Sequence, residues 1–354
     1  MFILHSSEFV SEGLFNLTNK FFYDEILKRR EFDVSIKANT DGLLEIIDML
    51  VELGWIVQPE ADTLDGCSWA NIDKVAATGK APNFWAVGDC KKITLNGTVG
   101  TLALDNYDTY VYIIDFDHDG TPNTIDFGTF KTSASGGKDV CLIDSKYRSG
   151  SSDDGTKYFN MNHWGNYNYG GWAGCDLRYD ILGSTNVAPS GYGSAPVSGR
   201  TGYDATETTA TSPVSGTLMA ALPTDLRAVM KPMTIYTDNV GGGTDTASNV
   251  TASIDYLPLL AEYEIWGTRQ YVNSIEQNYQ AQYTYFANGN SKVKYRHSAT
   301  GSTADWWGRS PYVLYDTLTN FCCVNVWADE SSSTYSWSSQ GIAPIFRVGA
   351  EPAA

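Results

Sequence analysis

The sequence predicts a folded protein of mixed class, in which short strands and short helices are separated by long loops. Hydrophobic residues make up 42% of the chain and charged residues only 18%, as in globular rather than disordered proteins. From about residue 63 onward, Gly, Ser, Thr, Asn and aromatic residues dominate and the regular patterns are short. Residues 1–60 carry a Leu/Ile/Glu/Lys pattern with little Gly, so the chain divides in two.

The first 62 residues are expected to form a separate segment that contains a helix. Asn39-Thr40-Asp41 is a suitable N-cap for a helix over about residues 41–53, and Gly54 is a suitable end. This helix would be apolar on nearly all sides, which predicts burial in its own domain or between subunits. We expect residues 1–62 to attach the protein or to join copies into a homo-oligomer, with a trimer as the working assumption.

The domain expected over residues 63–349, before a short tail over residues 350–354, has its own helix and strand signals. Ser68 can cap a helix over Trp69–Ala77. Runs of strand-forming residues predict strands at Lys92–Leu95, Gly100–Leu104 and Tyr110–Phe116. The β-branched and aromatic run Tyr110–Ile114 suits a central strand. Further short helices are expected at Trp172–Leu182, Leu218–Ala221, Asp225–Met230 and Ser274–Phe286.

The charge and the apolar pattern exclude two classes of function. The net charge of −17 argues against nucleic-acid binding, because phosphate backbones would be repelled. The longest apolar stretch, around residues 43–57, is interrupted by Glu45, Asp48 and Glu52, so no membrane insertion is expected. The N-terminus lacks the features of a signal peptide, and the six Cys form no CxxC pair. We therefore expect synthesis in a reducing cytosol, with six free, buried thiols.

Seven sequence blocks occur in the order that one protein family shares. They are Phe84–Asp89, Ile113–Asp119, Gly170–Trp172 with Arg178, Leu260–Gly267, Gln280–Gly289, Trp306–Pro311 and Gly341–Val348. Over about residues 63–349 the chain resembles a C-type-lectin-like domain of unknown function found in phage and gut-bacterial proteins. The clan of this domain also holds C-type lectins, formylglycine-generating enzymes and the variable receptor-binding proteins of phage. The resemblance implies an α+β fold, C-type-lectin-like or formylglycine-generating-enzyme-like, with small antiparallel sheets and long ordered loops.

The resemblance also implies where a ligand would bind. In the better-known relatives the ligand face lies between the aromatic–Arg–Ser block and the closing strand, which in this chain is the region between Trp306 and Gly341. The expected ligand-binding residues are polar and aromatic side chains of this region, namely Trp307, Tyr312, Asn325, Trp327, Tyr335 and Trp337. An equal alternative is that any of these side chains fills the core of a loop-rich fold. The earlier run His163–Tyr169 alternates aromatic residues with Asn and Gly, as antibody binding loops do.

Four residues are expected to hold the scaffold together. They are Trp172, Arg178, Trp306 and Arg309. An Arg close to a Trp in such blocks is typical of a buried ion pair, and Glu262 or Glu264 is a plausible partner for Arg309.

Calcium is the one cofactor that the sequence suggests. Asp115, Asp117 and Asp119 are spaced as in a calcium loop, with Asn123 and Asp126 at later ligand positions. The alternative is a plain β-hairpin with its turn at Asp119-Gly120, because a strand rather than a helix precedes the loop.

The sequence predicts a binding protein rather than an enzyme. No catalytic residue is expected, and the adjacent Cys322 and Cys323 point to opposite faces of a strand, which disfavours a formylglycine-generating-type oxidase. We expect a phage virion structural protein, such as a head fibre, decoration protein or tail appendage, made in the bacterial host cytoplasm. Its expected partners are capsid or tail proteins of the virion and a host glycan or surface receptor. A bacterial surface adhesin is the alternative.

Overall fold

The chain divides into two units, residues 1–58 and residues 59–354. The computed structural model describes residues 47, 49–51, 56–144, 158–163, 165–185, 210–314, 318–326 and 331–350. In the first unit, Ile47 and Met49–Val51 are helical and Leu50 is fully buried. These residues belong to the helix predicted over residues 41–53, and the rest of that helix lies outside the described residues.

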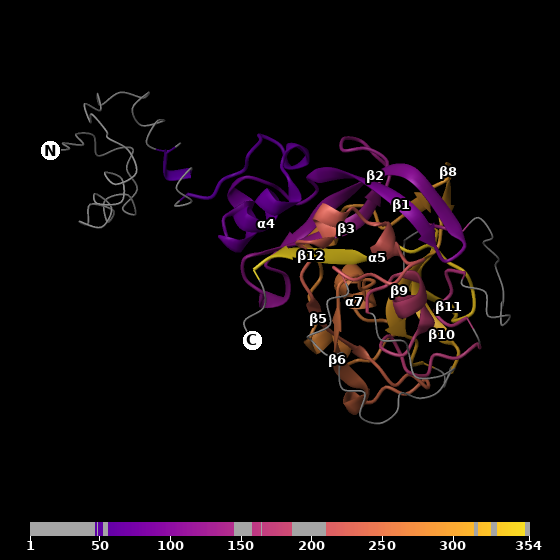
Figure 1. The fold of residues 1–354 in the computed structure, drawn as a ribbon. Helices are drawn as coiled ribbons and strands as arrows, with labels where there is room; N and C mark the ends of the chain where they lie inside the picture. Colours follow the sequence, from indigo (N-terminus) through magenta and orange to yellow (C-terminus); the bar gives the residue numbers. More distant parts are fainter. Residues whose placement is uncertain are drawn as a thin grey trace, which may run out of the picture. The chain divides into compact units, whose positions relative to one another are not determined.

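The largest sheet among the described strands of the second unit is four-stranded and antiparallel (Figure 1). Its strands are β1 (Cys90–Val99), β2 (Leu102–Phe116), β3 (Thr124–Lys131) and β12 (Ile345–Gly349), in the order β1-β2-β3-β12. Of the run predicted at Gly100–Leu104, the first two residues form the turn before β2, and the other three belong with Tyr110–Phe116 to this single strand. The central position expected for Tyr110–Ile114 is confirmed, because β2 pairs with β1 on one side and β3 on the other.

The helix α4 (Trp69–Ala77) packs on this sheet as the sequence predicts. The Ser68 hydroxyl accepts a hydrogen bond from the Asn71 backbone N–H at 3.2 Å, which caps the helix. The Trp69 ring meets Phe127 of β3 and Phe346 of β12 edge-on, at centroid distances of 5.4 and 5.9 Å. These contacts join the start of the unit to its closing strand.

Three smaller sheets complete the described strands. The first has the order β11-β10-β9, from β9 (Trp306–Pro311), β10 (Asn320–Val324) and β11 (Ser331–Tyr335). The second has the order β4-β7-β8, from β4 (Val140–Cys141), β7 (Lys294–Arg296) and β8 (Ala299–Ala304), and only β4 and β7 are parallel. The third pairs β5 (Met233–Asp238) with β6 (Val250–Asp255).

The remaining helices are short. They are α5 (Leu218–Ala221), α6 (Thr224–Arg227), α7 (Glu262–Trp266) and α8 (Thr284–Ala287), with single turns η1 (Leu64–Gly66), η2 (Ala81–Asn83), η3 (His118–Gly120), η4 (Leu177–Ile181), η5 (Ala247–Asn249) and η6 (Glu276–Asn278). The second unit is therefore a mixed protein with mostly small antiparallel sheets and few helices, which confirms the expected α+β class at this level. No helix among the described residues is long and apolar enough to cross a membrane. All six Cys are buried with free thiols.

Two helix predictions are wrong in extent. Residues 274–286 form no single helix, because Tyr283 is extended and the Gln280 side chain donates to the Tyr236 carbonyl oxygen at 2.9 Å. Residues 172–182 contain only the π-helical turn η4 (Leu177–Ile181), and the two residues before this stretch, Gly170 and Gly171, have left-handed backbones. The helix at Leu218–Ala221 is confirmed, whereas the one predicted at Asp225–Met230 is the shorter α6.

Candidate binding face

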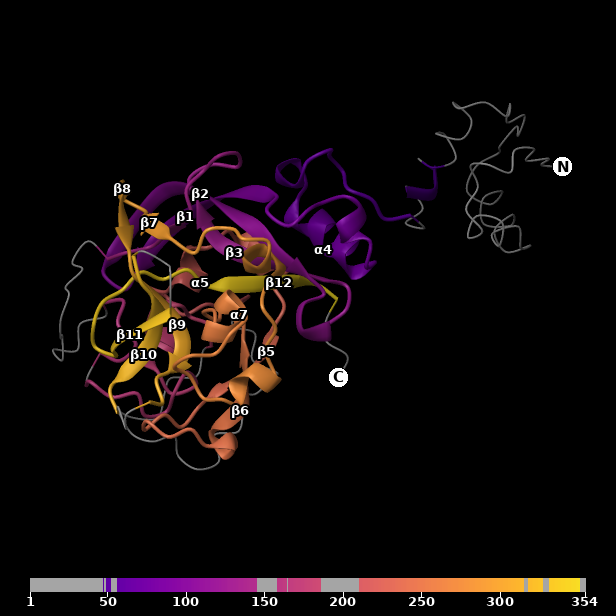
Figure 2. The same ribbon diagram turned by 180° about the vertical axis from the view of Figure 1, so that it is seen from behind.

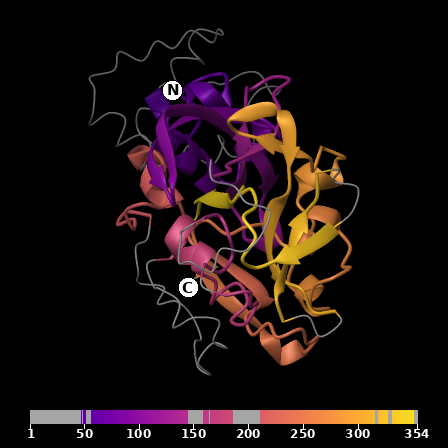
Figure 3. The same cartoon turned by 90° about the vertical axis from the view of Figure 1, so that its right-hand side faces the viewer.

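Three segments far apart in the sequence meet at one place in the second unit (Figure 3). They are residues 160–163 with 165–169, 318–320 and 335–338. The backbone N–H of Asn168 donates to the Leu318 oxygen at 2.8 Å, and that of Ser336 donates to the Thr319 oxygen at 2.8 Å. Asn162 closes the ring, since its N–H donates to the Ser336 oxygen at 3.1 Å. These bonds fix the three segments against one another.

Large apolar side chains are exposed on each of these segments. Tyr167 is 45% exposed, Leu318 is 38% exposed and Tyr335 is 53% exposed. Only two other large apolar side chains, Phe84 and Tyr279, are comparably exposed among the residues that the structure describes. We call Tyr167, Leu318, Tyr335 and the partly buried Trp337 the aromatic face.

The fully buried Asn168 holds the aromatic face from behind. Its Oδ1 accepts from the Gly242 N–H at 2.9 Å, and its Nδ2 donates to the oxygens of Asn320 at 3.0 Å and Tyr312 at 3.2 Å. Position 241 requires a glycine, because its φ is 67° and a Cβ there would lie 2.0 Å from the backbone carbonyl oxygen of Asn168. The face is therefore mounted on a fixed support.

The sequence-predicted ligand residues fall into different places. Tyr335 and Trp337 lie on the aromatic face, and Asn325 is partly buried just beyond β10. Trp307 fits the core alternative, because its ring is fully buried and its Nε1 donates to the Phe159 oxygen at 2.8 Å. Tyr312 is also largely buried, with its ring 5.4 Å from that of Tyr271. Trp327 lies outside the described residues.

Tyr167 and Leu318 were not among the predicted ligand residues. Tyr167 belongs to the aromatic and Asn-rich run that the sequence analysis compares with antibody binding loops, so the composition of this run indicated a binding role. Leu318 gave none, since an isolated Leu before a strand is most often a core residue.

The strand β9 lies between α7 and β10 (Figure 2), and its residue Arg309 pairs with Glu264. Its Nη1 and Nη2 lie 2.6 and 2.5 Å from the two oxygens of the Glu264 carboxylate. Both side chains are buried, and the Glu264 charge helps to raise the pKa of Arg309 against the opposing effect of burial. Glu262, the other partner considered, accepts instead from backbone N–H groups of residues 270–272.

A second buried ion pair joins Arg178 to Asp255 at the end of β6. Arg178 Nε donates to Asp255 Oδ1 at 2.6 Å, and Trp172 Nε1 donates to Asp255 Oδ2 at 3.2 Å. Trp306 is likewise buried, with its Nε1 donating to the Lys292 oxygen at 3.0 Å. The four residues expected to serve the scaffold are thus all buried and hydrogen-bonded.

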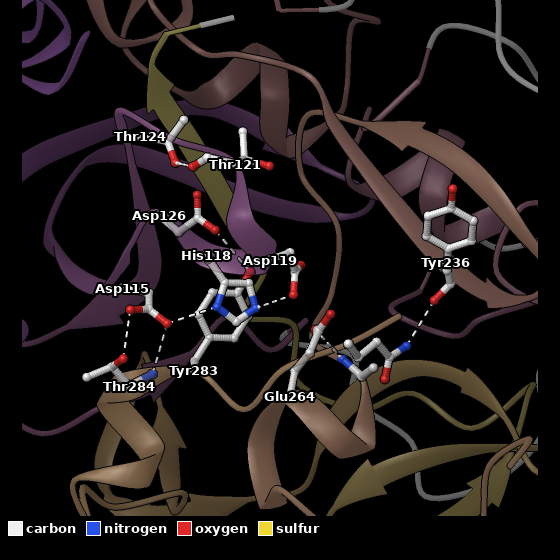
Figure 4. A network of polar contacts seen from close by, with 12 residues as sticks. Asp115, His118, Asp119, Thr121, Thr124, Asp126, Tyr236, Glu264, Tyr283 and Thr284 are labelled. Carbon is white, nitrogen blue, oxygen red and sulfur yellow. Dashed lines mark hydrogen bonds and ion pairs between the residues drawn. The ribbon is translucent and has the colours of Figure 1, made fainter. Parts of the chain in front are cut away.

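The residues of the predicted calcium loop lie at the turn between β2 and β3 (Figure 4). Asp115 accepts from His118 Nδ1 at 2.8 Å and from Thr284 Oγ1 at 2.7 Å, whereas Asp126 pairs with Arg347 at 2.6 and 2.8 Å. The two carboxylates are therefore engaged with other groups.

Asp117, Asp119 and Asn123 have left-handed backbones, with φ of 53°, 54° and 63°. Within the described ranges, no three His, Cys, Asp or Glu side chains are placed to hold a metal ion together. This arrangement of the turn residues fits the plain β-hairpin, the alternative to a calcium loop. Calcium binding stays a prediction, and it would require Asp126 to release Arg347.

His118 lies buried between two carboxylates at this turn. Its ring stacks on Tyr283 at 3.6 Å, and its Nε2 lies 3.2 Å from Asp119 Oδ1, outside hydrogen-bond geometry. Burial lowers the pKa of His118, but the hydrogen bond to Asp115 and the charge of Asp119 outweigh this effect and raise it. Burial raises the pKa of Asp119 from its ordinary value of 3.8 to about 6, against the attraction of His118.

Asp119→Asn is expected to stabilise the protein above pH 6 and to have little effect below pH 4. The raised pKa means that ionising Asp119 costs the folded state stability as the pH rises from about 4 to about 6. Because the side chain is still 29% exposed, we expect a gain of about 1–2 kcal/mol, less than the full shift implies. Asn also tolerates the left-handed backbone.

Urea denaturation between pH 3.5 and pH 8 measures this difference. Asp117→Asn is the matched control, since Asp117 has the same backbone conformation but its Oδ1 accepts from the Thr124 N–H at 3.1 Å. A stability difference between Asp119→Asn and the wild type that does not change with pH would contradict the expectation.

The second unit is thus an α+β protein with small antiparallel sheets and long loops, and its aromatic face lies where the three segments described above meet. Residues 138–350 match a family described as a domain of unknown function, DUF6273, and the chain belongs to that family. This range contains the whole aromatic face and begins later than the start near residue 63 that the resemblance suggested. Neither a curated protein nor a solved structure matches the chain. The C-type-lectin-like resemblance stays a prediction.

Proposed function

We propose that the protein is a non-enzymatic attachment protein that binds its target through the aromatic face. The observation that carries this proposal is the exposure of Tyr167, Leu318 and Tyr335 on segments that are hydrogen-bonded to one another. Exposed apolar side chains that gather on one surface are typical of interaction sites. Tyr and Trp rings supply large contact areas at a low entropic cost, and a fixed support lowers that cost further.

The setting that we propose is a phage virion, where the protein is a head fibre, decoration protein or tail appendage. A C-type-lectin-like domain would then present the aromatic face to a host glycan or surface receptor. The seven ordered sequence blocks and the small antiparallel sheets support this part of the proposal. The first unit would bind capsid or tail proteins or sister copies. Immunogold electron microscopy tests the setting: label on phage particles supports it, and label on bacterial surfaces alone overturns it.

Tyr335→Ala and Tyr167→Ala are expected to weaken attachment to bacterial cells while leaving the melting temperature nearly unchanged. Both rings are about half exposed, so their removal costs little core packing. An aromatic anchor of an interface contributes about 2 kcal/mol or more, which corresponds to roughly a thirtyfold loss of affinity. Trp337→Ala should weaken attachment similarly, with a small loss of stability because its ring is partly buried.

The measurement is sedimentation of labelled protein with intact cells, together with thermal unfolding of each variant. Tyr279→Ala is the matched control, since Tyr279 is 48% exposed but stacks on Tyr236, which is not part of the aromatic face. Unfolding of the Tyr335 and Tyr167 variants, or attachment as strong as that of the control, would count against the proposed function.

A further inference from the structure

We infer that the aromatic face takes an uncharged carbohydrate chain, held by ring stacking and neutral hydrogen bonds rather than by ion pairs or a metal ion. This inference rests on the proposed function and names the ligand class of the same site. Its first support is the charge of the surrounding segments. Charged residues make up 18% of the whole chain, yet none occurs among residues 158–163, 165–171, 318–326 and 331–342, and the charged residues that flank these ranges, Lys157, Asp316, Asp329 and Glu330, lie outside the described residues.

Two carboxylates that follow the first segment of the face, Asp176 and Asp180, lie beside His163. Asp176 Oδ2 accepts from the backbone N–H of His163 at 2.9 Å, and Asp180 Oδ2 lies 3.5 Å from Nε2 of the same residue. His163 is fully buried, so one oxygen of each acidic group is directed toward the support of the face. An anionic glycan would need Arg or Lys side chains to bind its charges, and the net charge of −17 would repel it.

One face of the β10–β11 pair has the groups that a sugar ring requires. Tyr335 lies directly opposite Asn320 in the ladder, and Ser333 lies two residues before Tyr335 on the same strand face. The Asn320 Nδ2 donates to the Ser333 Oγ at 3.2 Å, which places an amide and a hydroxyl next to the exposed ring. Amides and hydroxyls both donate and accept, as the hydroxyl groups of a sugar do.

A second pair of rings lies on the adjoining segment. Tyr167 and Tyr169 have centroids 6.0 Å apart and planes inclined by 28°, so they form a nearly parallel stack. Asn168, the neighbour of Tyr167, binds the backbone of Leu318 and Asn320, so this segment is fixed beside the start of β10, and we take the two ring sites as one surface. Two ring sites on a fixed surface suit consecutive units of a saccharide chain.

The test uses the full-length protein and immobilised polysaccharides as probes. The uncharged set is dextran, a mannan and a galactan, and the anionic set is heparin, polygalacturonate and poly(glycerol phosphate). We expect binding to at least one uncharged polysaccharide, changed less than about twofold by 1 M NaCl or by EDTA, since neither an ion pair nor a metal contributes. Tyr335→Ala and Tyr167→Ala should lower this binding by about tenfold or more, whereas Tyr279→Ala should not.

The outcomes separate this inference from the proposed function. If the Tyr335 and Tyr167 variants lose cell attachment but the wild type binds only the anionic set, or none of the polysaccharides, the inference is overturned and the proposed function remains. The same holds if proteinase treatment of the cells abolishes attachment, because the target is then a protein. Loss of polysaccharide binding in EDTA would also overturn it. If these variants attach to cells as well as the wild type does, the proposed function itself fails.

Discussion

Replacing Arg309 with Ala is expected to lower the free energy of unfolding by about 3–5 kcal/mol. The guanidinium is fully buried and meets the Glu264 carboxylate through two bonds, and it also donates to the Leu259 oxygen and the Thr237 hydroxyl, each at 2.8 Å. The substitution leaves the negative charge of Glu264 in the interior without its counter-ion. An uncompensated buried charge costs far more than the ion pair itself contributes.

Urea denaturation of the variant and the wild type gives this difference. Arg269→Ala is the matched control, because Arg269 pairs with Asp245 at 2.9 Å but both side chains are partly exposed. Its loss should cost about 1 kcal/mol or less. Replacing both buried partners, Arg309→Met with Glu264→Leu, should recover part of the lost stability, since no lone charge then remains. Equal costs for Arg309→Ala and Arg269→Ala would show that burial adds nothing to the importance of Arg309.

Asp255→Ala is expected to be at least as damaging, at about 4–5 kcal/mol. The fully buried Asp255 carboxylate accepts four hydrogen bonds from side chains, two on each oxygen. The donors are Arg178 at 2.6 Å, Ser253 at 2.8 Å, Ser184 at 2.9 Å and Trp172 at 3.2 Å. Removing the carboxylate leaves a buried guanidinium and three other donors without their acceptor, and each unmade bond has its own cost.

Asp108→Ala serves as the control for this substitution. Asp108 pairs with Lys92 at 2.6 Å, but the two side chains are about half exposed, so a much smaller loss of stability is expected than for Asp255→Ala. The measurement is again the free energy of unfolding in urea. Should Asp255→Ala unfold no more readily than Asp108→Ala, the four hydrogen bonds would have little net value and Asp255 would not be a stabilising centre of the fold.

Local signals allowed some elements to be predicted well. The helix α4 follows from Ser68 and the pattern after it, which are all within one stretch of chain. The centre of β2 follows from its run of β-branched and aromatic residues. The helix predicted at residues 274–286 fails because side chains in this stretch bond to distant backbone groups, as Glu276 does with the Asp238 N–H at 2.8 Å. Such partners cannot be read from the stretch itself.

The site was predictable only in part, for a similar reason. Tyr335 and Trp337 stand out by their composition, among Ser and Thr residues late in the chain. Trp307 has the same ring chemistry, but all six residues of β9 are buried, including Arg309 and Ser310. These polar residues make the strand look half exposed in the sequence. Their partners, Glu264 and Glu276, lie on other elements, so only the fold reveals that both faces of β9 are covered.

The residue that supports the aromatic face, Asn168, is different from the residues that a ligand would contact. One side chain joins the Gly242 turn, Tyr312 and Asn320, while the neighbouring Tyr167 projects outward and takes no part in these bonds. The residues that would determine ligand specificity are therefore not the residues that stabilise the fold. Randomising the outward positions, such as Tyr167 and Tyr335, would yield a library of new recognition surfaces on one unaltered frame, in the manner of antibody loops on their framework.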